Sequence, residues 1–358
     1  MPSRRQFLAG LAVTAGLPVR GWADIGGPAY LAAAREPSGT FALFGLDSAG
    51  RDLFRIALPD RGHAAAAHPV APEAVAFARR PGRFALVIDC LDGRLAHRLD
   101  APAGRHFYGH GAFLHGGEIL ATSESDFESG AGRIGLWTRS RNYARIGEIA
   151  SGGIGPHDIR AWSDEVLVVA NGGIRTHPDS GRAKLNLATM QPNLSYVTLS
   201  GEVLDQVQLP ADLRQNSIRH LALAPDGQVA FAMQWEGEPG AATPLLGLHR
   251  RGAAPVLAAA DLAEQLAMQG YAGSIAFAAD GSTVGITSPR GGRLHLFDRD
   301  GGFIAAFRRA DICGLAAGPA GFVATDGLGG VLQGTAAALA PLSTAERAWD
   351  NHLVAIAG

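Results

Sequence analysis

The chain has 358 residues, with 48 Gly, 20 Pro and 18% charged residues, a composition typical of one large β-rich domain or two smaller domains and not of a disordered or fibrous protein. Its 31 basic and 33 acidic residues lack the basic excess of a nucleic-acid-binding protein, so nucleic acid is not expected as a partner. No apolar run reaches the roughly 18 residues of a membrane helix, so no membrane span is expected.

The N-terminus carries the order of features of a twin-arginine signal peptide. The segment Ser3-Arg-Arg-Gln-Phe-Leu8 precedes a short apolar run, Leu8 to Leu17, and a small-residue site that ends at Ala23. This order predicts that residues 1–23 are removed and that the protein is exported to the periplasm. The twin-arginine route carries folded proteins, often ones that take up a metal or cofactor first, so it favours a metal.

Residues 24–358 contain a recurring unit. Its clearest copy is a polar anchor and strand from His110 to Gly117, a second strand at Ile119–Thr122, a third at Ile134–Trp137 and an outer strand at Tyr143–Ile149. Repeats of about 40 to 50 residues are typical of propellers. Four short antiparallel strands per repeat, with alternating apolar positions and Gly or Asp turns, predict one propeller blade.

The repeat predicts seven blades. The anchors of the first strands are His63, His110, His157, His220, Ser274 and Gly314, with His352 as the seventh. Tyr30–Ala34, Phe41–Leu46 and Asp52–Leu58 form three strands without an anchor, and the strand 352–356 has no partners of its own. We therefore predict an all-β fold, a seven-bladed β-propeller closed by pairing of the N- and C-terminal segments. A β-sandwich or another repeat fold is the alternative.

Two blades carry insertions. The segment 172–193 of blade four is too long for a hairpin turn and is predicted to form a lid. It contains His177, which either covers the channel, binds an anionic ligand together with Arg175, or only hydrogen-bonds the loop. The segment 235–243 extends the equivalent loop of blade five, and 261–268 has the spacing of a short amphipathic helix.

Five of the seven anchors are histidine, whereas compact haem, nucleotide, protease and calcium motifs are absent from the sequence. Residues at one repeat phase form a ring around a propeller channel, so five imidazoles are expected to converge. Imidazole is the commonest neutral ligand of transition metals and suits zinc, copper, iron and nickel, which predicts a metal site. The alternative is that each histidine caps its blade through a backbone hydrogen bond. The candidate ligands are His63, His110, His157, His220 and His352.

The ends of the second strands supply a further polar set at the same face. Its members are Arg79, Glu124, Asn171, Gln234, Ser288 and Asp326. Asp158, next to His157, and Glu124 are expected to orient an imidazole nitrogen. Asn171, Gln234 and Asp326, with Arg175 and His177 of the insertion, are candidate outer partners of the metal or contacts to a substrate. Five further histidines are expected at the solvated surface, and they are His68, His97, His115, His249 and His295.

Several segments of the chain look familiar together. They are Phe107-Tyr-Gly-His-Gly-Ala112, Gly153 to Asp158, Asn171 to Asn186, Ser217-Ile-Arg-His220, Thr287 to Gly292 and Trp349-Asp-Asn-His-Leu353. With the twin-arginine leader, they resemble a proteobacterial domain-of-unknown-function family of exported propellers, over nearly the whole mature chain. Members are typically encoded beside imelysin-type periplasmic iron-uptake proteins and a dihaem-cytochrome-like protein. The resemblance implies a role in periplasmic iron handling and an imelysin-like partner, but no particular reaction.

Three functions follow as hypotheses. The first, which we prefer, is a periplasmic propeller that binds a transition metal in a histidine-lined channel and acts in iron or copper acquisition. The second is a metal-dependent lyase or lactonase in which a histidine or Glu124 moves a proton; the shortage of acidic groups at ring positions disfavours the hard cations that such enzymes use. The third is a metal-free scaffold whose lid and 235–243 loop dock an imelysin-like partner.

Overall fold

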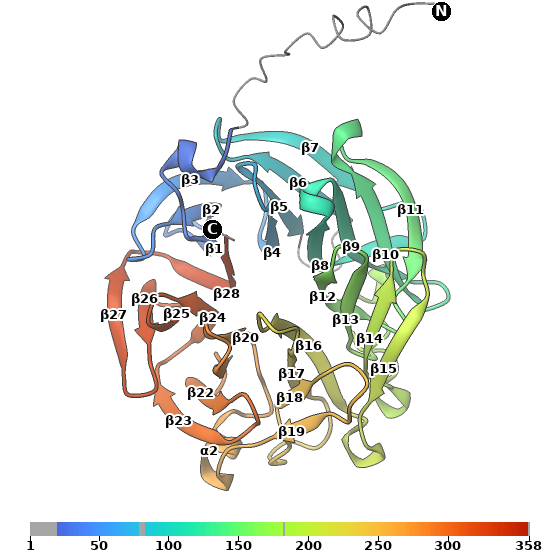
Figure 1. The fold of residues 1–358 in the computed structure, drawn as a ribbon, viewed down its shortest axis with the longest axis vertical. Helices are drawn as coiled ribbons and strands as arrows, with labels where there is room; N and C mark the ends of the chain where they lie inside the picture. The colour runs from blue at the N-terminus through green and yellow to red at the C-terminus, as the bar shows by residue number, and fades with distance from the viewer. Residues whose placement is uncertain (1–19, 79–82, 182, 357–358) are drawn as a thin grey trace, which may run out of the picture.

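The structure, a computed structural model, describes residues 20–78, 83–181 and 183–356. Within these residues 28 strands form seven four-stranded antiparallel sheets arranged around one axis (Figure 1). The predicted all-β, seven-bladed propeller is therefore confirmed. Most of the predicted signal peptide, residues 1–19, lies outside the described residues, and its removal and the export of the protein stay predictions.

Each blade runs from an innermost strand at the axis to an exposed strand at the rim (Figure 1). Blade one contains β28 (Ala348–Ala355), β1 (Tyr30–Arg35), β2 (Phe41–Leu46) and β3 (Asp52–Leu58). Blade two contains β4 (Gly62–Ala67), β5 (Glu73–Ala78), β6 (Phe84–Asp89) and β7 (Arg94–Asp100). Blade three contains β8 (Arg105–Leu114), β9 (Ile119–Asp126), β10 (Gly132–Thr138) and β11 (Ala144–Ala150).

The remaining blades follow the same order. Blade four contains β12 (Pro156–Ser163), β13 (Val166–Asn171), β14 (Asn193–Thr198) and β15 (Val203–Gln208). Blade five contains β16 (Asn216–Leu223), β17 (Val229–Trp235), β18 (Leu246–His249) and β19 (Val256–Ala258). Blade six contains β20 (Ser274–Phe277), β21 (Thr283–Ser288), β22 (Arg293–Asp298) and β23 (Phe303–Arg308). Blade seven contains β24 (Ile312–Gly318), β25 (Gly321–Asp326), β26 (Gly330–Gly334) and β27 (Leu339–Thr344).

In the part of the chain that the structure describes, the helices are short and lie before the first strand or between strands. The helix α2 (Leu262–Ala267) joins blades five and six, where the sequence predicted it. The short 3₁₀ helices are η1 (Trp22–Ile25), η2 (His115–Gly117), η3 (Arg139–Arg141), η4 (Pro178–Ser180), η5 (Leu187–Thr189) and η6 (Ala211–Leu213). Among the described residues we find no helix with the length and apolar character needed to cross a membrane.

The ring closes in blade one. The C-terminal strand β28 pairs antiparallel with β1, with Tyr30 opposite Ala355 and Leu31 opposite Val354. The two ends of the propeller thus share one sheet, as predicted, and this pairing satisfies backbone groups that an open array would leave exposed at the inner strands.

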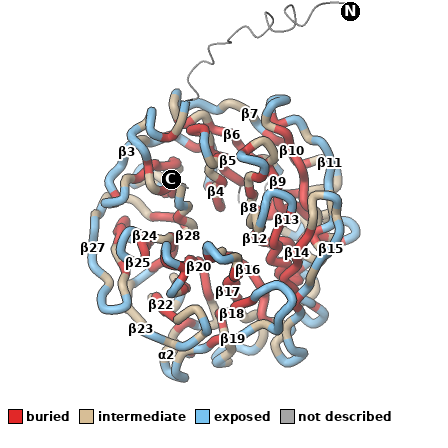
Figure 2. The backbone as a smooth tube through the Cα atoms, in the orientation of Figure 1, coloured by how far each residue is buried: buried red, intermediate tan, exposed pale blue. Residues whose placement is uncertain are grey.

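The apolar core lies between blades. Phe77 of blade two packs with Phe107 and Trp137 of blade three in one such cluster, and equivalent clusters fill the other junctions. Burial is concentrated in the inner strands, whereas the outer strands are largely exposed (Figure 2). Because each blade buries its faces against two neighbours, the innermost strands are held firmly, and so are the side chains that they carry toward the axis.

A β-bulge occurs at each histidine anchor. The register shifts of the innermost strands lie between Gly62 and Ala65, Phe107 and Gly111, Pro156 and Asp158, Ile218 and His220, and Trp349 and Leu353. A bulge locally breaks the alternation of a strand and re-aims a side chain. The prediction that strands begin at the anchor is wrong for β8, β16 and β28, which start at Arg105, Asn216 and Ala348. The histidines of these three strands therefore lie within the strands and not at their first residue.

Gly109 shows why this packing needs glycine. Its φ is +101°, and a Cβ atom at this position would lie 2.4 Å from Cδ2 of His63. Only glycine combines this backbone conformation with so close an approach. Gly109 thus lets β8 pass the His63 ring one residue before it presents His110.

Candidate metal centre

The five histidine anchors converge on one cluster. The ring centroids of His157 and His220 are 4.7 Å apart, and those of His220 and His352 are 4.9 Å apart. The His63 ring is 5.0 Å from the rings of both His110 and His352. The sequence predicted a shared repeat phase, and the structure shows that the five rings, from five consecutive blades, reach a common region.

The two remaining anchors close the ring differently. The Ser274 hydroxyl of blade six accepts a hydrogen bond from the Leu315 backbone N–H at 3.2 Å. Gly314 of blade seven has no side chain, and a Cβ there would lie 2.9 Å from the backbone nitrogen of Leu353. These positions tie blades six, seven and one together and leave the cluster to the histidines.

Two groups of three histidines have the spacing of a metal site. In each, one nitrogen from every ring lies within 4.8 Å of the others; the groups are His63, His110 and His352, and His110, His157 and His220. A metal with bonds of about 2.1 Å holds neighbouring nitrogen ligands about 3.4 Å apart. Each group is thus a small side-chain movement from coordination, and His110 belongs to both.

Asp158 orients the shared histidine. Its carboxylate lies 3.2 Å from Nδ1 of His110 and accepts hydrogen bonds from the backbone N–H groups of Ile159 and, in blade five, Leu221. A carboxylate at Nδ1 places the proton there and leaves Nε2 as the ligand atom, the usual arrangement of metal-binding histidines. Sequence analysis expected Asp158 to orient a ring, and the ring is that of His110.

Charge supports the same contact. Burial opposes ionisation of Asp158, but the nearby Arg160 and His110 outweigh it and hold the pKa of this carboxyl below its ordinary range. Asp158 is therefore an anion at neutral pH, and it is 1% exposed. A buried anion at this position holds the tautomer and the orientation of the imidazole that donates to it.

Outside the cluster, both ring nitrogens of His295 are buried without a hydrogen-bond partner among the described residues. Within the cluster, four buried imidazole nitrogens share this feature, and they are Nε2 of His110, Nδ1 of His157, Nδ1 of His220 and Nε2 of His352. Buried polar atoms are nearly always paired, so these four are unusual. They do not make the backbone hydrogen bonds that the capping alternative requires. Their position in the two triads makes them suitable for a metal.

The protonation state also suits a metal. Burial, followed by the charges of neighbouring imidazoles, lowers the pKa of His157 and of His352, and lowers the pKa of His220 to about 3. These rings are neutral at physiological pH. A neutral imidazole keeps the lone pair that a metal ion requires.

A cavity of about 300 Å³ opens beside the cluster, and His63, His157 and His220 form part of its wall. Gln234, predicted as a contact to metal or substrate, also lines it and donates from Nε2 to the Ala272 carbonyl at 3.2 Å. The rings of these three histidines therefore face a cavity that a ligand of moderate size can occupy. Sequence analysis missed three cationic residues of this cavity, which are Lys184, Arg219 and Arg290.

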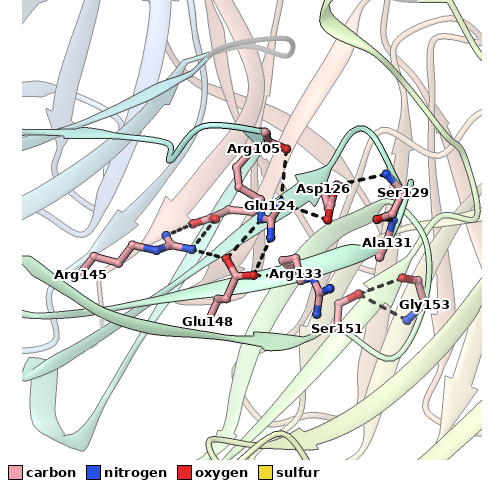
Figure 3. Close-up of polar contacts among 11 residues, drawn as sticks. Arg105, Glu124, Asp126, Ser129, Ala131, Arg133, Arg145, Glu148, Ser151 and Gly153 are labelled. Carbon is pink, nitrogen blue, oxygen red and sulfur yellow. Dashed lines mark hydrogen bonds and ion pairs between the residues drawn. The ribbon is translucent and has the colours of Figure 1, made fainter.

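The structure does not bring Glu124 to the histidines. Its carboxylate accepts hydrogen bonds from Nη1 and Nη2 of Arg145 at 2.7 and 2.9 Å (Figure 3). It also accepts a hydrogen bond from the Thr122 hydroxyl at 2.7 Å. Arg145 lies on β11, the outermost strand of blade three. Gly135 on β10 leaves room for this contact, because a Cβ there would lie 1.9 Å from Oε1 of Glu124. The side chain thus points along its own blade toward the rim.

Asn171 and Asp326 also have local partners. The Asn171 amide bonds to Ser151 and Asn193, within and beside blade four. The Asp326 carboxylate accepts from Arg309 at 2.6 Å and from the turn N–H groups that follow β25. Both residues connect strand ends. Arg79 lies outside the described residues.

Arg175 and His177 contact the neighbouring blade three. The insertion joins β13 to β14, and an Nη of Arg175 is 3.5 Å from the carbonyl of Glu128. The His177 ring lies 5.0 Å from that of Phe127 and 3.9 Å from the Glu128 carboxylate. These two side chains contact a loop of blade three, whereas Lys184 of the same insertion lines the cavity.

Three other histidines are buried, so their predicted surface position is wrong. His249 bonds to the Tyr196 hydroxyl at 2.8 Å and to the Ala253 carbonyl at 3.0 Å. His295 lies 3.4 Å from the Glu264 carboxylate. His68 is buried at the opposite end of β4 from His63. His249 and His295 lie on the third strands of their blades, and His68 directly follows the first strand of blade two. The alternation of apolar and polar residues along a strand does not show that such positions are covered.

Acid should destabilise the protein partly through His68. Its Nδ1 accepts the N–H groups of Val70 and Ala71, and burial together with Arg139 lowers the pKa of His68 to about 4, against a smaller opposing effect of Glu73. The unfolded chain binds this proton from about pH 6.5 downward and the folded chain only near pH 4, so stability is full above pH 6.5 and falls through that window. The loss is at most about 3 kcal/mol. His68→Asn, which keeps an acceptor, should flatten the decline in urea unfolding curves measured between pH 7 and 4; an unchanged slope would contradict this assignment.

Seven closed blades with a histidine cluster at their axis define this molecule as a β-propeller with a candidate metal centre. The chain belongs to the family described as "Protein of unknown function (DUF1513)", which matches residues 56–356. This confirms the predicted membership of a domain-of-unknown-function propeller family; the imelysin-like partner stays a prediction. No curated protein matches the chain.

Solved structures share the fold at low identity. Hydrazine synthase of Kuenenia stuttgartiensis is 14% identical with a TM-score of 0.59, and the match covers 87% of this chain and 95% of that one. A chain of the mitotic checkpoint complex is 10% identical with a TM-score of 0.56, over 78% and 75%. KlHsv2 with loop 6CD replaced by a Gly-Ser linker is 15% identical with a TM-score of 0.51, over 88% and 90%. These likenesses support the propeller fold alone.

Proposed function

We propose that this protein binds a transition-metal ion in the propeller channel and acts in the acquisition or handling of iron or copper in the periplasm. One observation carries the proposal. Four buried imidazole nitrogens without hydrogen-bond partners belong to two histidine triads, and the histidine that both triads share is oriented by Asp158. An unpaired buried nitrogen costs about 1–3 kcal/mol. Coordination of a metal ion by that nitrogen would offset this cost.

The ligand set favours a borderline metal. Both triads consist of imidazoles alone, whereas calcium and magnesium need several oxygen ligands. Imidazole suits iron, copper, zinc and nickel. The resemblance to exported propellers encoded beside iron-uptake proteins selects iron or copper among these, and the twin-arginine leader supports uptake of the metal by a folded chain.

The chain's own residues divide the work. Asp158 holds His110 with Nε2 toward the cluster, and His157 and His220 join it from blades four and five. A bound ion would supply a Lewis-acidic centre, redox-active for iron or copper. Because His63, His157 and His220 line that cavity, the residues permit exchange of the metal with a ligand in solution.

The lyase or lactonase alternative is weakened by the position of Glu124. This is the acidic residue that the hypothesis used for proton transfer, and its carboxylate is engaged by Arg145. The metal-free scaffold alternative predicts that segment 172–193, and not the histidines, controls association with a partner.

The test is metal binding by matched variants. The wild-type protein, stripped with a chelator and titrated with Fe²⁺, Cu²⁺ or Zn²⁺, should bind about one ion per chain. His110→Ala removes the ligand shared by both triads and should weaken binding roughly a hundredfold or more. His220→Ala should weaken binding as strongly as His110→Ala does, whereas His352→Ala affects only the other triad and should have a smaller effect. His115→Ala is the control, since His115 is partly exposed and contacts Glu165.

The proposal fails if the double variant His110→Ala, His157→Ala keeps the metal content of the wild type. Circular dichroism and gel filtration of each variant establish that the fold is intact. Equal metal loss in His115→Ala would also contradict the assignment, because it would indicate nonspecific binding by surface histidines.

A further inference from the structure

The cavity beside the histidines has a cationic wall. Lys184 comes from the insertion of blade four, Arg219 from β16 of blade five and Arg290 from the β21–β22 turn of blade six. The described lining residues include no carboxylate. A cavity walled by three cations, with no carboxylate among its described lining residues, favours an anion.

Arg219 is the most informative of the three. Its side chain is 6% exposed and its Nε has no hydrogen-bond partner among the described residues. One Nη of Arg219 lies 3.2 Å from the Glu236 carboxylate. A buried guanidinium with an unused N–H beside a cavity is suited to an oxyanion, since its donors match carboxylate and phosphate oxygens.

The same carboxylate fixes Lys184. Glu236 pairs with both Lys184 and Arg219 and is itself 9% exposed, but it does not line the cavity. The Glu236 carboxylate, which is not part of the cavity lining, thus holds both Lys184 and Arg219 in place. With Arg290 included, the wall keeps an excess of two positive charges.

Arg290, the third cation of the cavity wall, is held by an aromatic contact. Its guanidinium lies over the Tyr271 ring at 4.3 Å, and Tyr271 forms an isolated β-bridge with Gln234. The Asn351 amide donates to the Tyr271 hydroxyl at 3.5 Å. Because the three cations come from three blades, one small monovalent anion does not satisfy all of them.

We propose that this cavity binds a small anion that carries two or more carboxylate or phosphate groups, which lies over the open side of the histidine cluster. Resting on the proposed function, this implies that the metal reaches or leaves the histidines as an anionic chelate. Lys184, Arg219 and Arg290 would neutralise the chelator, while His157 and His220 take its metal. The cavity volume of about 300 Å³ accommodates a molecule of the size of a tricarboxylate.

Calorimetric titration of the metal-free protein with citrate, pyrophosphate and acetate tests the anion site directly. Citrate or pyrophosphate should bind at least tenfold more tightly than acetate, and the tighter of the two identifies the class. Arg219→Gln should weaken that binding about tenfold or more. Lys184→Gln and Arg290→Gln, at more exposed positions, provide the same test if Arg219→Gln does not fold. Arg98→Gln on the rim strand β7 is the matched control and should bind as the wild type does.

The two proposals fail separately. His110 does not line the cavity, so His110→Ala should lose the metal and keep the anion. If all three anions bind equally, or if the cavity variants bind citrate and pyrophosphate as tightly as the wild type, the anion site is overturned whatever the metal content. If anion binding is normal but no variant of the histidines changes the metal content, only the proposed metal function is overturned.

Discussion

Replacing His220 with leucine should stabilise the metal-free protein and abolish its stabilisation by metal. His220 is 4% exposed, its Nδ1 is unpaired, and burial lowers its pKa to about 3, so the folded state holds a neutral imidazole with an unsatisfied atom. Leucine has a similar volume and no polar atom, and its burial should add about 1 kcal/mol to the free energy of unfolding. The wild type, at a metal concentration a thousandfold above its Kd, should gain about 4 kcal/mol that the variant does not.

A second buried histidine is the matched control. His249 is 2% exposed, but both of its nitrogens are paired, with Tyr196 and with the Ala253 carbonyl. His249→Leu removes these hydrogen bonds and leaves the Tyr196 hydroxyl unpaired, so it should lower the free energy of unfolding by about 1–3 kcal/mol. Its response to metal should equal that of the wild type.

Urea unfolding with and without metal gives both quantities. The opposite signs expected for His220→Leu and His249→Leu distinguish a ligand site from a structural one. If His220→Leu were destabilised as much as His249→Leu in the absence of metal, the channel histidines would be structural caps.

The sequence was sufficient for the propeller because every blade repeats the same alternation of apolar strands and turns. It also predicted which histidines meet, since His110, His157 and His220 occupy one repeat phase. It did not predict the bulges that accompany them, because register is set by hydrogen bonding between strands and not by residue type.

The partners of the cluster were harder to predict. Asp158 was expected to orient an imidazole, but the sequence did not show that this imidazole is His110 of blade three, because the register shift between Pro156 and Asp158 decides where the side chain points. The basic wall was missed because its cations come from three blades that are far apart in sequence. Lys184 carried a signal, as the only lysine of the chain, but composition alone does not place it at a cavity.

Breaking the pair of Glu124 and Arg145 should strongly destabilise the fold without changing its metal content. Glu124 is fully buried, whereas the Arg145 side chain is 19% exposed. Arg145 has a second carboxylate partner, Glu148, at 3.0 Å (Figure 3). Arg145→Met leaves a buried carboxylate without its cation and should lower the free energy of unfolding by about 3–5 kcal/mol. Glu124→Gln keeps the shape and leaves Arg145 paired with Glu148, so its loss should be smaller, about 1–2 kcal/mol.

The double variant Glu124→Gln, Arg145→Met should be more stable than Arg145→Met alone, because it removes the buried carboxylate that Arg145→Met leaves without a cation. Urea unfolding of the four proteins measures this coupling, and metal titration of the same samples measures the channel. Metal affinity should stay within threefold of the wild type throughout. A tenfold loss in Glu124→Gln would instead place this carboxylate among the partners of the histidines, which its hydrogen bonds to Arg145 and Thr122 argue against.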